Sequence, residues 1–108
     1  MNYPVKGEFI AIDPSPTRGH EQHGWRPVLV VSSNKLNQKG LAWVMPVTST
    51  VTGPGRFVLP DGEPVKGAVL FLQLRMVDCV ARPFDSLGYA SDDVLDAALA
   101  YAASILEV

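Results

Sequence analysis

Residues 16–27 bring a carboxylate, two imidazoles and two guanidiniums together in one short stretch of the chain. They read Pro-Thr-Arg-Gly-His-Glu-Gln-His-Gly-Trp-Arg-Pro, and the glycines and prolines among them exclude a helix. The apolar run 28–31 follows at once and is typical of a buried strand. Groups that can transfer a proton or bind a phosphate thus lie on a loop beside a rigid element, which indicates a working site. On this stretch alone, an ordinary solvated loop is an equal alternative.

Metal-free cleavage of RNA is one reaction that these side chains can perform. The 2′-hydroxyl of the substrate is the nucleophile, so the protein must accept its proton, stabilise the phosphoryl oxygens and help the 5′-oxygen leave. His20, Glu21 and Arg26 could serve these needs from the loop, and Thr48 could add a hydroxyl from the end of a strand. Arginine suits the phosphate because its rigid fork donates two parallel hydrogen bonds. A surface ion pair between Arg26 and Glu21 or Asp13 remains open as a purely structural alternative.

Other chemistries have weaker support. His20, His23 and Cys79 lack the spacing of a zinc site, so we predict no metal. The glycines match neither the phosphate-loop nor the dinucleotide pattern, so no nucleotide cofactor is expected. Ser32 and Ser33 follow a strand but lack the glycine-flanked turn of a hydrolase nucleophile.

Length and composition predict one globular domain, residues 1–108, with 47% hydrophobic residues. A single cysteine and the lack of a leader or membrane-length apolar run favour the cytoplasm. The net charge is −2, but residues 1–84 carry nine basic and six acidic residues (+3), and residues 85–108 carry five acidic residues and no base (−5). A basic face can therefore attract phosphates while an acidic segment elsewhere sets the total charge.

Several short strands separated by turn residues predict a small, strongly bent antiparallel sheet or barrel. A polar connection should span 33–40, a loop should surround Gly53 to Gly55, and Asp61-Gly62 should form a tight turn between antiparallel strands. Segment 75–81 should continue the last strand or pair with it. The expected strands are 8–12, 27–32, 41–48, 57–60 and 68–74.

The C-terminal segment has the pattern of an amphipathic helix. Ser91 can cap its start, and Asp92 and Asp93 suit the positive end of the helix dipole. The apolar stripe should pack against the sheet rather than lie on a membrane, since the polar face carries no basic residue. The stripe consists of Val94, Leu95, Ala98, Leu99, Ala102, Ile105 and Leu106.

The longest motif resembles the signature of the MazF/PemK/Kid toxins of bacterial toxin–antitoxin modules. Residues 16–27 and the following strand are similar to that family's P-T-x-G-x-E-Q-x-G-x-R-P and its apolar strand. Residues 46–48 resemble its V-P-x-T strand end, and residues 67–82 resemble its later G-V-x-x-x-Q-x-R-x-x-D-x-x-A-R segment. The similarity extends over nearly the whole chain, which makes chance a poor explanation.

The resemblance implies a mainly β fold with a C-terminal α-helix, a small SH3-like barrel of the CcdB/Kid/MazF-like plasmid maintenance toxin type. It also implies a homodimer that acts as a sequence-specific, ribosome-independent endoribonuclease on single-stranded mRNA, leaving 2′,3′-cyclic phosphate and 5′-hydroxyl ends. No metal or other cofactor and no membrane are expected. The implied partner is a cognate antitoxin whose acidic, disordered tail covers the basic groove.

The resemblance also implies roles for individual residues. Arg26 and Thr48 match the family's main catalytic arginine and threonine, Glu21 matches its loop glutamate, and His20 matches the loop histidine of some members. Gln73 matches a glutamine near the RNA-binding groove. The other residues that we predict to bind RNA are Arg18, Gln22, Trp25 and Arg75, with an exposed Trp25 able to stack on a base.

One departure from the family pattern keeps alternatives open. Leu70 and Leu72 stand where some members carry an arginine and an aspartate, so neither position can move a proton here and Glu21 or His20 is the expected base. A degenerate member that keeps the fold but has lost catalysis is one alternative. A CcdB-like toxin that binds gyrase without cutting nucleic acid is another, although the chain lacks the C-terminal tryptophan of such toxins.

Overall fold

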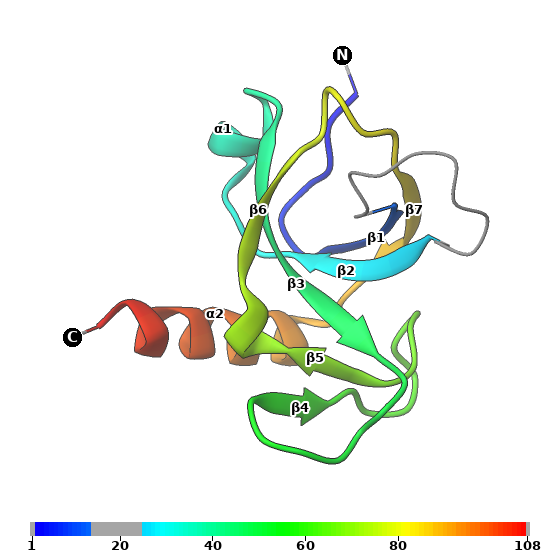
Figure 1. Ribbon diagram of the computed structural model, residues 1–108, viewed down its shortest axis with the longest axis vertical. Coiled ribbons are helices and arrows are strands. Elements are labelled where there is room, and N and C mark those ends of the chain that lie inside the picture. Colours follow the sequence, from blue (N-terminus) through cyan, green and yellow to red (C-terminus); the bar gives the residue numbers. More distant parts are fainter. Residues whose placement is uncertain (1, 14–24, 108) are drawn as a thin grey trace.

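Seven antiparallel strands and a C-terminal helix make up the fold in the computed structural model, which describes residues 2–13 and 25–107 (Figure 1). The mainly β architecture with a terminal helix, predicted from the sequence, is confirmed. The elements are β1 (Glu8–Ile12), β2 (Arg26–Val30), α1 (Asn34–Asn37), β3 (Leu41–Thr48), β4 (Arg56–Val58), β5 (Ala68–Leu70), the 3₁₀ turn η1 (Phe71–Gln73), β6 (Arg75–Asp78), β7 (Asp85–Tyr89) and α2 (Asp92–Leu106).

Strand β3 organises the sheet, because it pairs with three other strands. The order is β4-β5-β3-β2-β1-β7, and β6 also pairs with β3. On one edge, β6 pairs with the first half of β3 and β5 with its last two residues, while β2 pairs along the other edge. The chain passes from β5 to β6 through η1, so the sheet divides at this point (Figure 1).

Both faces of the central strands are covered by apolar side chains. Successive residues of a strand point to opposite faces, so Phe9, Leu29 and Met45 enter one core cluster while Ile10 and Val28 enter the other. All five are 3% exposed or less. This double burial explains the nearly unbroken apolar runs of β1 and β2, and it makes both strands a rigid base for the residues that follow them.

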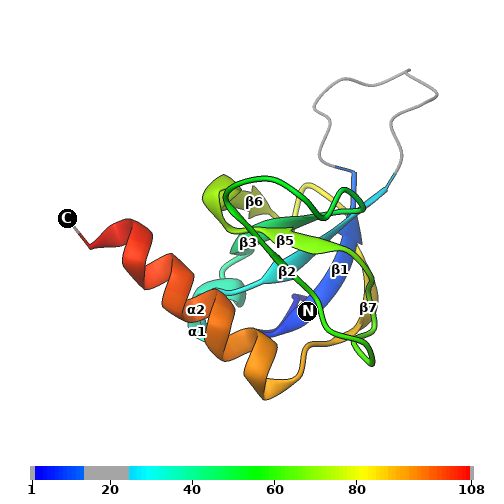
Figure 2. The same ribbon diagram turned by 90° about the horizontal axis from the view of Figure 1, so that it is seen from below.

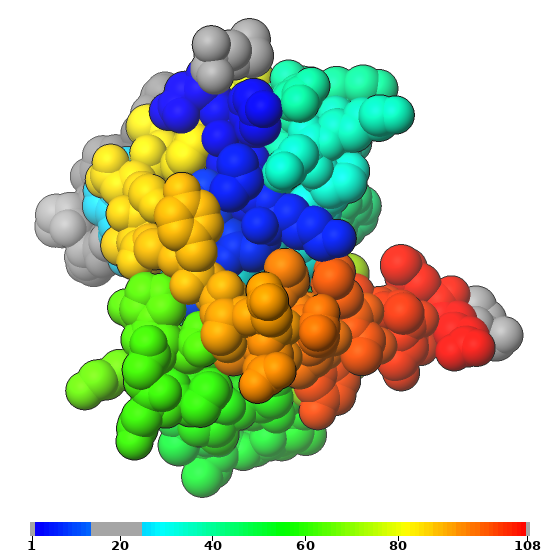
Figure 3. Space-filling view, turned by 180° about the vertical axis from the view of Figure 1, so that it is seen from behind, coloured from blue at the N-terminus to red at the C-terminus, as the bar shows by residue number. Residues whose placement is uncertain are grey.

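Helix α2 covers the first of these clusters. The Ser91 hydroxyl accepts the Val94 N–H at 3.3 Å, as the predicted cap requires, and Val94 and Ala98 are buried in the cluster. The end of the predicted stripe is different, since Ile105 and Leu106 are 39% and 72% exposed. The prediction that they pack on the sheet is wrong because the last turns of the helix project beyond it (Figures 2 and 3).

Three of the predicted segments need correction. The polar connection 33–40 contains the short helix α1, whose first turn is capped by the Ser33 hydroxyl. The strand expected at 68–74 ends at Leu70, because β3 exchanges β5 for β6 as its partner at this point and η1 makes the crossing. Segment 75–81 is a strand only to Asp78, and it pairs with β3 rather than with β5.

Strand β7 was not predicted at all, since Asp85–Tyr89 has neither alternation nor an apolar run. Its pairing with β1 creates the strand, with a register shift between Phe9 and Ile10. Asp61-Gly62 does form a turn, but within the longer connection 59–67 between β4 and β5. The predicted strands 27–32 and 57–60 are observed as Arg26–Val30 and Arg56–Val58.

No helix within the described ranges is both long and apolar enough to cross a bilayer. The homodimer and the closure of the sheet into an SH3-like barrel stay predictions.

Candidate active site

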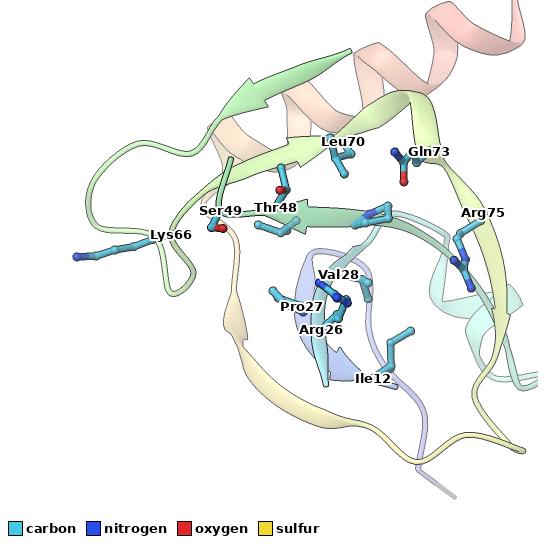
Figure 4. Close-up of a pocket in the computed structure, with 12 residues that line it drawn as sticks. Ile12, Arg26, Pro27, Val28, Thr48, Ser49, Lys66, Leu70, Gln73 and Arg75 are labelled. Atoms are coloured by element: carbon cyan, nitrogen blue, oxygen red, sulfur yellow. The ribbon is translucent and has the colours of Figure 1, made fainter. Parts of the chain in front are cut away.

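A pocket of about 480 Å³ opens where the sheet divides (Figure 4). The start of β2 and the end of β3 form one part of its wall, and β5, η1 and the start of β6 form another. The side chains that line it are Ile12, Arg26, Pro27, Val28, Pro46, Val47, Thr48, Ser49, Lys66, Leu70, Gln73 and Arg75.

Arg26 reaches this pocket as the first residue of β2. Its backbone is set by antiparallel pairing with Ile12 of β1, and the buried residues that follow in β2 anchor the strand. The side chain is exposed, and its guanidinium has no hydrogen-bond or ion-pair partner within the described part of the chain. A guanidinium on a rigid strand end with free donors can bind a phosphate without first breaking an internal contact.

Thr48 reaches the same pocket as the last residue of β3. Its Oγ1 accepts a hydrogen bond from the Thr50 backbone N–H at 3.1 Å, which leaves the hydroxyl proton able to donate to a ligand. Gly67, just before β5, has a φ of +126°, and a Cβ there would overlap the Thr48 carbonyl oxygen. Only glycine therefore lets the start of β5 pack this closely against Thr48.

The pocket is basic. Arg26, Lys66 and Arg75 line it, and no carboxylate does so among the residues that the structure describes. Three cations around one hollow attract a polyanion even though the protein has a net charge of −2. Gln73 adds an amide whose donors and acceptor can bind the edge of a base.

The structure thus brings together Arg26, Thr48, Gln73 and Arg75, which come from four different elements (Figure 4). Trp25, at 50% exposure, has the predicted access to solvent but does not line the pocket.

Four of the predicted site residues, Arg18, His20, Glu21 and Gln22, lie outside the described residues. Of the two leucines that depart from the family pattern, Leu70 lines the pocket, while Leu72 does not and is 63% exposed.

Sequence reasoning missed two polar residues of the pocket, Lys66 and Ser49. A signal for Lys66 was available, since it is the only base between Arg56 and Arg75 and stands directly before Gly67 at the start of a predicted strand. Ser49 follows Thr48, and nothing in the pattern distinguishes it from an ordinary polar residue after a strand.

Cys79 is not a reactive group in this fold. It is buried in the second core cluster, and burial raises the pKa of its thiol, with a further increase from the negative charge of neighbouring Asp78. A protonated thiol is a poor nucleophile and a poor metal ligand. Within the described ranges, no group of three histidine, cysteine or acidic side chains is placed to hold a metal ion.

Comparison with known proteins identifies one toxin family. Residues 5–106 match the family model described as PemK-like, MazF-like toxin of type II toxin–antitoxin system. The chain is 35% identical over 109 residues to the endoribonuclease toxin ChpB of Escherichia coli K12, covering 94% of this chain and 93% of ChpB.

Solved structures with a similar fold belong to the same group of toxins. Over the full length of both chains, the fold is similar to MazF from Deinococcus radiodurans, with a TM-score of 0.84 and 34% identity. A chain of the MazE-MazF complex from the same organism matches with a TM-score of 0.85 and 33% identity over 97% of both chains.

Proposed function

Because the chain belongs to the family of PemK-like and MazF-like toxins of type II toxin–antitoxin systems, we propose that it is the toxin of such a module and cleaves single-stranded mRNA at specific sequences. The observation that carries this proposal is the shared pocket of Arg26 and Thr48, which come from different strands and line it with two further cations. Similar proteins named endoribonucleases support the reaction class.

The proposed reaction is a transesterification within the RNA. The 2′-oxygen loses its proton and attacks the neighbouring phosphorus, and the bond from phosphorus to the 5′-oxygen breaks. The leaving 5′-oxygen takes a proton from solvent, so the products are a 2′,3′-cyclic phosphate and a 5′-hydroxyl. Arg26 binds the phosphoryl oxygens through its fork, and the Thr48 hydroxyl donates to the same group as negative charge accumulates on it. No water is consumed and no metal is required in this scheme.

The 2′-proton needs an acceptor, and we assign this role to Glu21 or His20. Leu70 lines the pocket at the position where some relatives carry an arginine, and it cannot exchange a proton. Ile12 and Arg26, which precede and follow the segment with both candidates, are paired in register and both line the pocket. That pairing supports a base supplied from this segment.

The remaining polar residues bind the RNA in this proposal. Lys66 and Arg75 neutralise phosphates on either side of the scissile bond, and Gln73 contacts a base edge. Exposed Trp25 stacks on a splayed base, and Arg18 and Gln22 add contacts. A basic pocket of this kind also suits an acidic segment of an antitoxin, and structures of MazE-MazF complexes support such a partner.

A second candidate function is supported by Leu70. With a leucine in the pocket and no carboxylate or imidazole lining it in the described part of the chain, a member that binds antitoxin and RNA without cutting would have this appearance. The two candidates differ in a single observable, the cleavage of RNA.

Digestion of a long RNA by the purified protein in EDTA tests the proposal. We expect cuts at one short repeated sequence, with 2′,3′-cyclic phosphate ends that resist tailing until the cyclic ester is opened and the resulting monophosphate is removed by a phosphatase. Arg26→Ala and Thr48→Ala should abolish most cleavage, and Lys39→Ala, an exposed lysine outside the pocket, should not. RNA that is bound but left intact would favour the second candidate.

A further inference from the structure

We propose that Arg56 is a positioning residue that holds the Thr48 hydroxyl in its reactive orientation, an inference that rests on the proposed catalytic function of Thr48. Arg56 begins β4, three strands away along the sheet from β2, which carries Arg26, and it does not line the pocket. Nothing in its sequence position marks it as functional.

The connection between Arg56 and Thr48 runs through one residue, Thr50. The Arg56 Nη1 donates a hydrogen bond to the Thr50 carbonyl oxygen at 2.5 Å. The Thr50 N–H in turn donates to the Thr48 Oγ1 at 3.1 Å. Thr50 is exposed and follows the end of β3, and these two hydrogen bonds link its backbone to β3 and to β4.

The loop that contains Thr50 folds closely around the guanidinium. A Cβ at Gly53 would lie 3.2 Å from the Arg56 Cζ and 3.3 Å from its Nε, and Gly53 has a φ of +127°. Glycine at this position therefore lets the backbone pack directly on the guanidinium. The backbone of this loop is therefore in direct contact with the Arg56 side chain.

Arginine is not the residue that stability alone would favour here. Its Nε is buried and has no hydrogen-bond partner in the described part of the chain. A buried donor without an acceptor is unfavourable, and a lysine could supply a donor to Thr50 without leaving that atom unpaired. The hydrogen bond to Thr50 is therefore formed at the cost of one unpaired buried donor.

The arrangement decides where the Thr48 proton points. A threonine hydroxyl at a strand end can rotate between staggered positions and can bond to its own backbone instead of to a ligand. The Thr50 N–H occupies one lone pair of Oγ1, which fixes the oxygen and leaves its proton for a phosphoryl oxygen in the pocket. Loss of this restraint should slow the chemical step more than it weakens RNA binding.

A double-mutant cycle tests the proposal. The variants are Arg56→Met, which keeps the length and apolar packing of the side chain, Arg56→Lys, Thr48→Ala and the double variant Arg56→Met/Thr48→Ala. We expect Arg56→Met to lower kcat about tenfold with little change in KM, and Arg56→Lys to restore most of that loss. The double variant should be no slower than Thr48→Ala alone, because Arg56 then has no hydroxyl to position.

Amide hydrogen exchange supplies a readout that does not depend on cleavage. We expect the Thr50 N–H to exchange faster in Arg56→Met than in the wild type and to regain protection in Arg56→Lys. Lys39→Met, which also removes one exposed positive charge, should alter neither this exchange nor kcat. The kcat values are compared among variants that unfold cooperatively on heating, which shows that they are folded.

Two results would overturn the inference: effects of Arg56→Met and Thr48→Ala that multiply in the double variant, or unchanged Thr50 exchange in Arg56→Met. The proposed function fails in a different way, through wild-type protein that does not cut RNA or a Thr48→Ala variant that cuts like the wild type.

Discussion

The polar side chains near the start of strand β3 are buried and bonded to one another, whereas the arginines around the pocket at its other end are exposed and have no partners within the described residues. At its start, the Ser32 hydroxyl donates to the Asn37 Oδ1 at 2.5 Å and accepts the Trp43 N–H at 2.9 Å, and the Asn37 Nδ2 donates to the Ser32 carbonyl at 3.2 Å. Asn37 is completely buried. At the end of β3, Arg26 and Arg75 are exposed around the pocket and have no side-chain partners within the described residues.

This difference separates polar groups that stabilise the fold from polar groups that are available to a ligand. Hydrogen bonds between buried polar atoms offset the desolvation cost of burying them. Here these bonds hold α1 and β3 together. Convergent polar groups without internal partners contribute little to folding and become paired only when a ligand arrives. Substitutions of these unpartnered polar side chains should therefore change activity rather than stability.

The largest change in activity is expected at the pocket end of β3. Arg26→Ala should lower kcat by about 10² to 10³-fold, since it removes the main donor to the phosphoryl oxygens. The free energy of unfolding should change by less than about 0.5 kcal/mol, because the guanidinium has no partner to lose within the described residues. Cleavage kinetics and urea denaturation measure the two quantities. A large loss of stability would show that Arg26 is a structural residue instead.

Gly67→Ala should affect both stability and activity, because this glycine packs against the Thr48 carbonyl at the pocket. We expect a loss of about 3 kcal/mol in the free energy of unfolding from its φ of +126° and the overlap with Thr48, together with slower cleavage. Gly62→Ala is the matched control, since Gly62 also has a positive φ (+97°) but nothing within 4 Å of the added Cβ. Equal losses in the two variants, measured by urea denaturation, would refute a specific contact with Thr48.

Ser32→Ala tests the buried polar groups at the start of β3. It leaves the Trp43 N–H and the Asn37 Oδ1 without their partner, so the free energy of unfolding should fall by about 2 kcal/mol. The kcat of the remaining folded protein should equal that of the wild type. Ser104→Ala, at an exposed position of α2, serves as the control and should change stability by less than about 0.5 kcal/mol. Reduced kcat in folded Ser32→Ala would mean that the two ends of β3 are coupled.

The smallest effect is expected for Arg75→Ala, which tests whether this pocket cation contacts a phosphate. Arg75→Ala should weaken binding of a non-cleavable RNA several-fold and reduce the slope of log K against log[salt] by about 0.7 if one phosphate contact is lost. Lys39→Ala should leave the slope unchanged. Binding titrations between low and moderate salt give both values, and an unchanged slope in Arg75→Ala would place this arginine outside the RNA path.

Local patterns predicted several elements because their causes lie within a few residues of one another. The Ser91 cap, the acidic first turn and the apolar spacing of α2 were readable in the chain, and so were the apolar runs of β1 and β3. The exchange of β5 for β6 along β3 was not readable, nor was β7, since each depends on pairing with a strand far away in the sequence.

For the site, local sequence patterns were enough to identify the candidate residue types: arginine after a glycine-rich stretch, threonine at a strand end, and glutamine close before another arginine. The fold was needed to show that Arg26, Thr48, Gln73 and Arg75 line one pocket together with Lys66. It was also needed to show that Arg56 donates a hydrogen bond to Thr50 from outside that pocket. The reason is physical. Side-chain chemistry is local, but the distance between two side chains depends on which strands pair, and that choice is made by burial over the whole sheet.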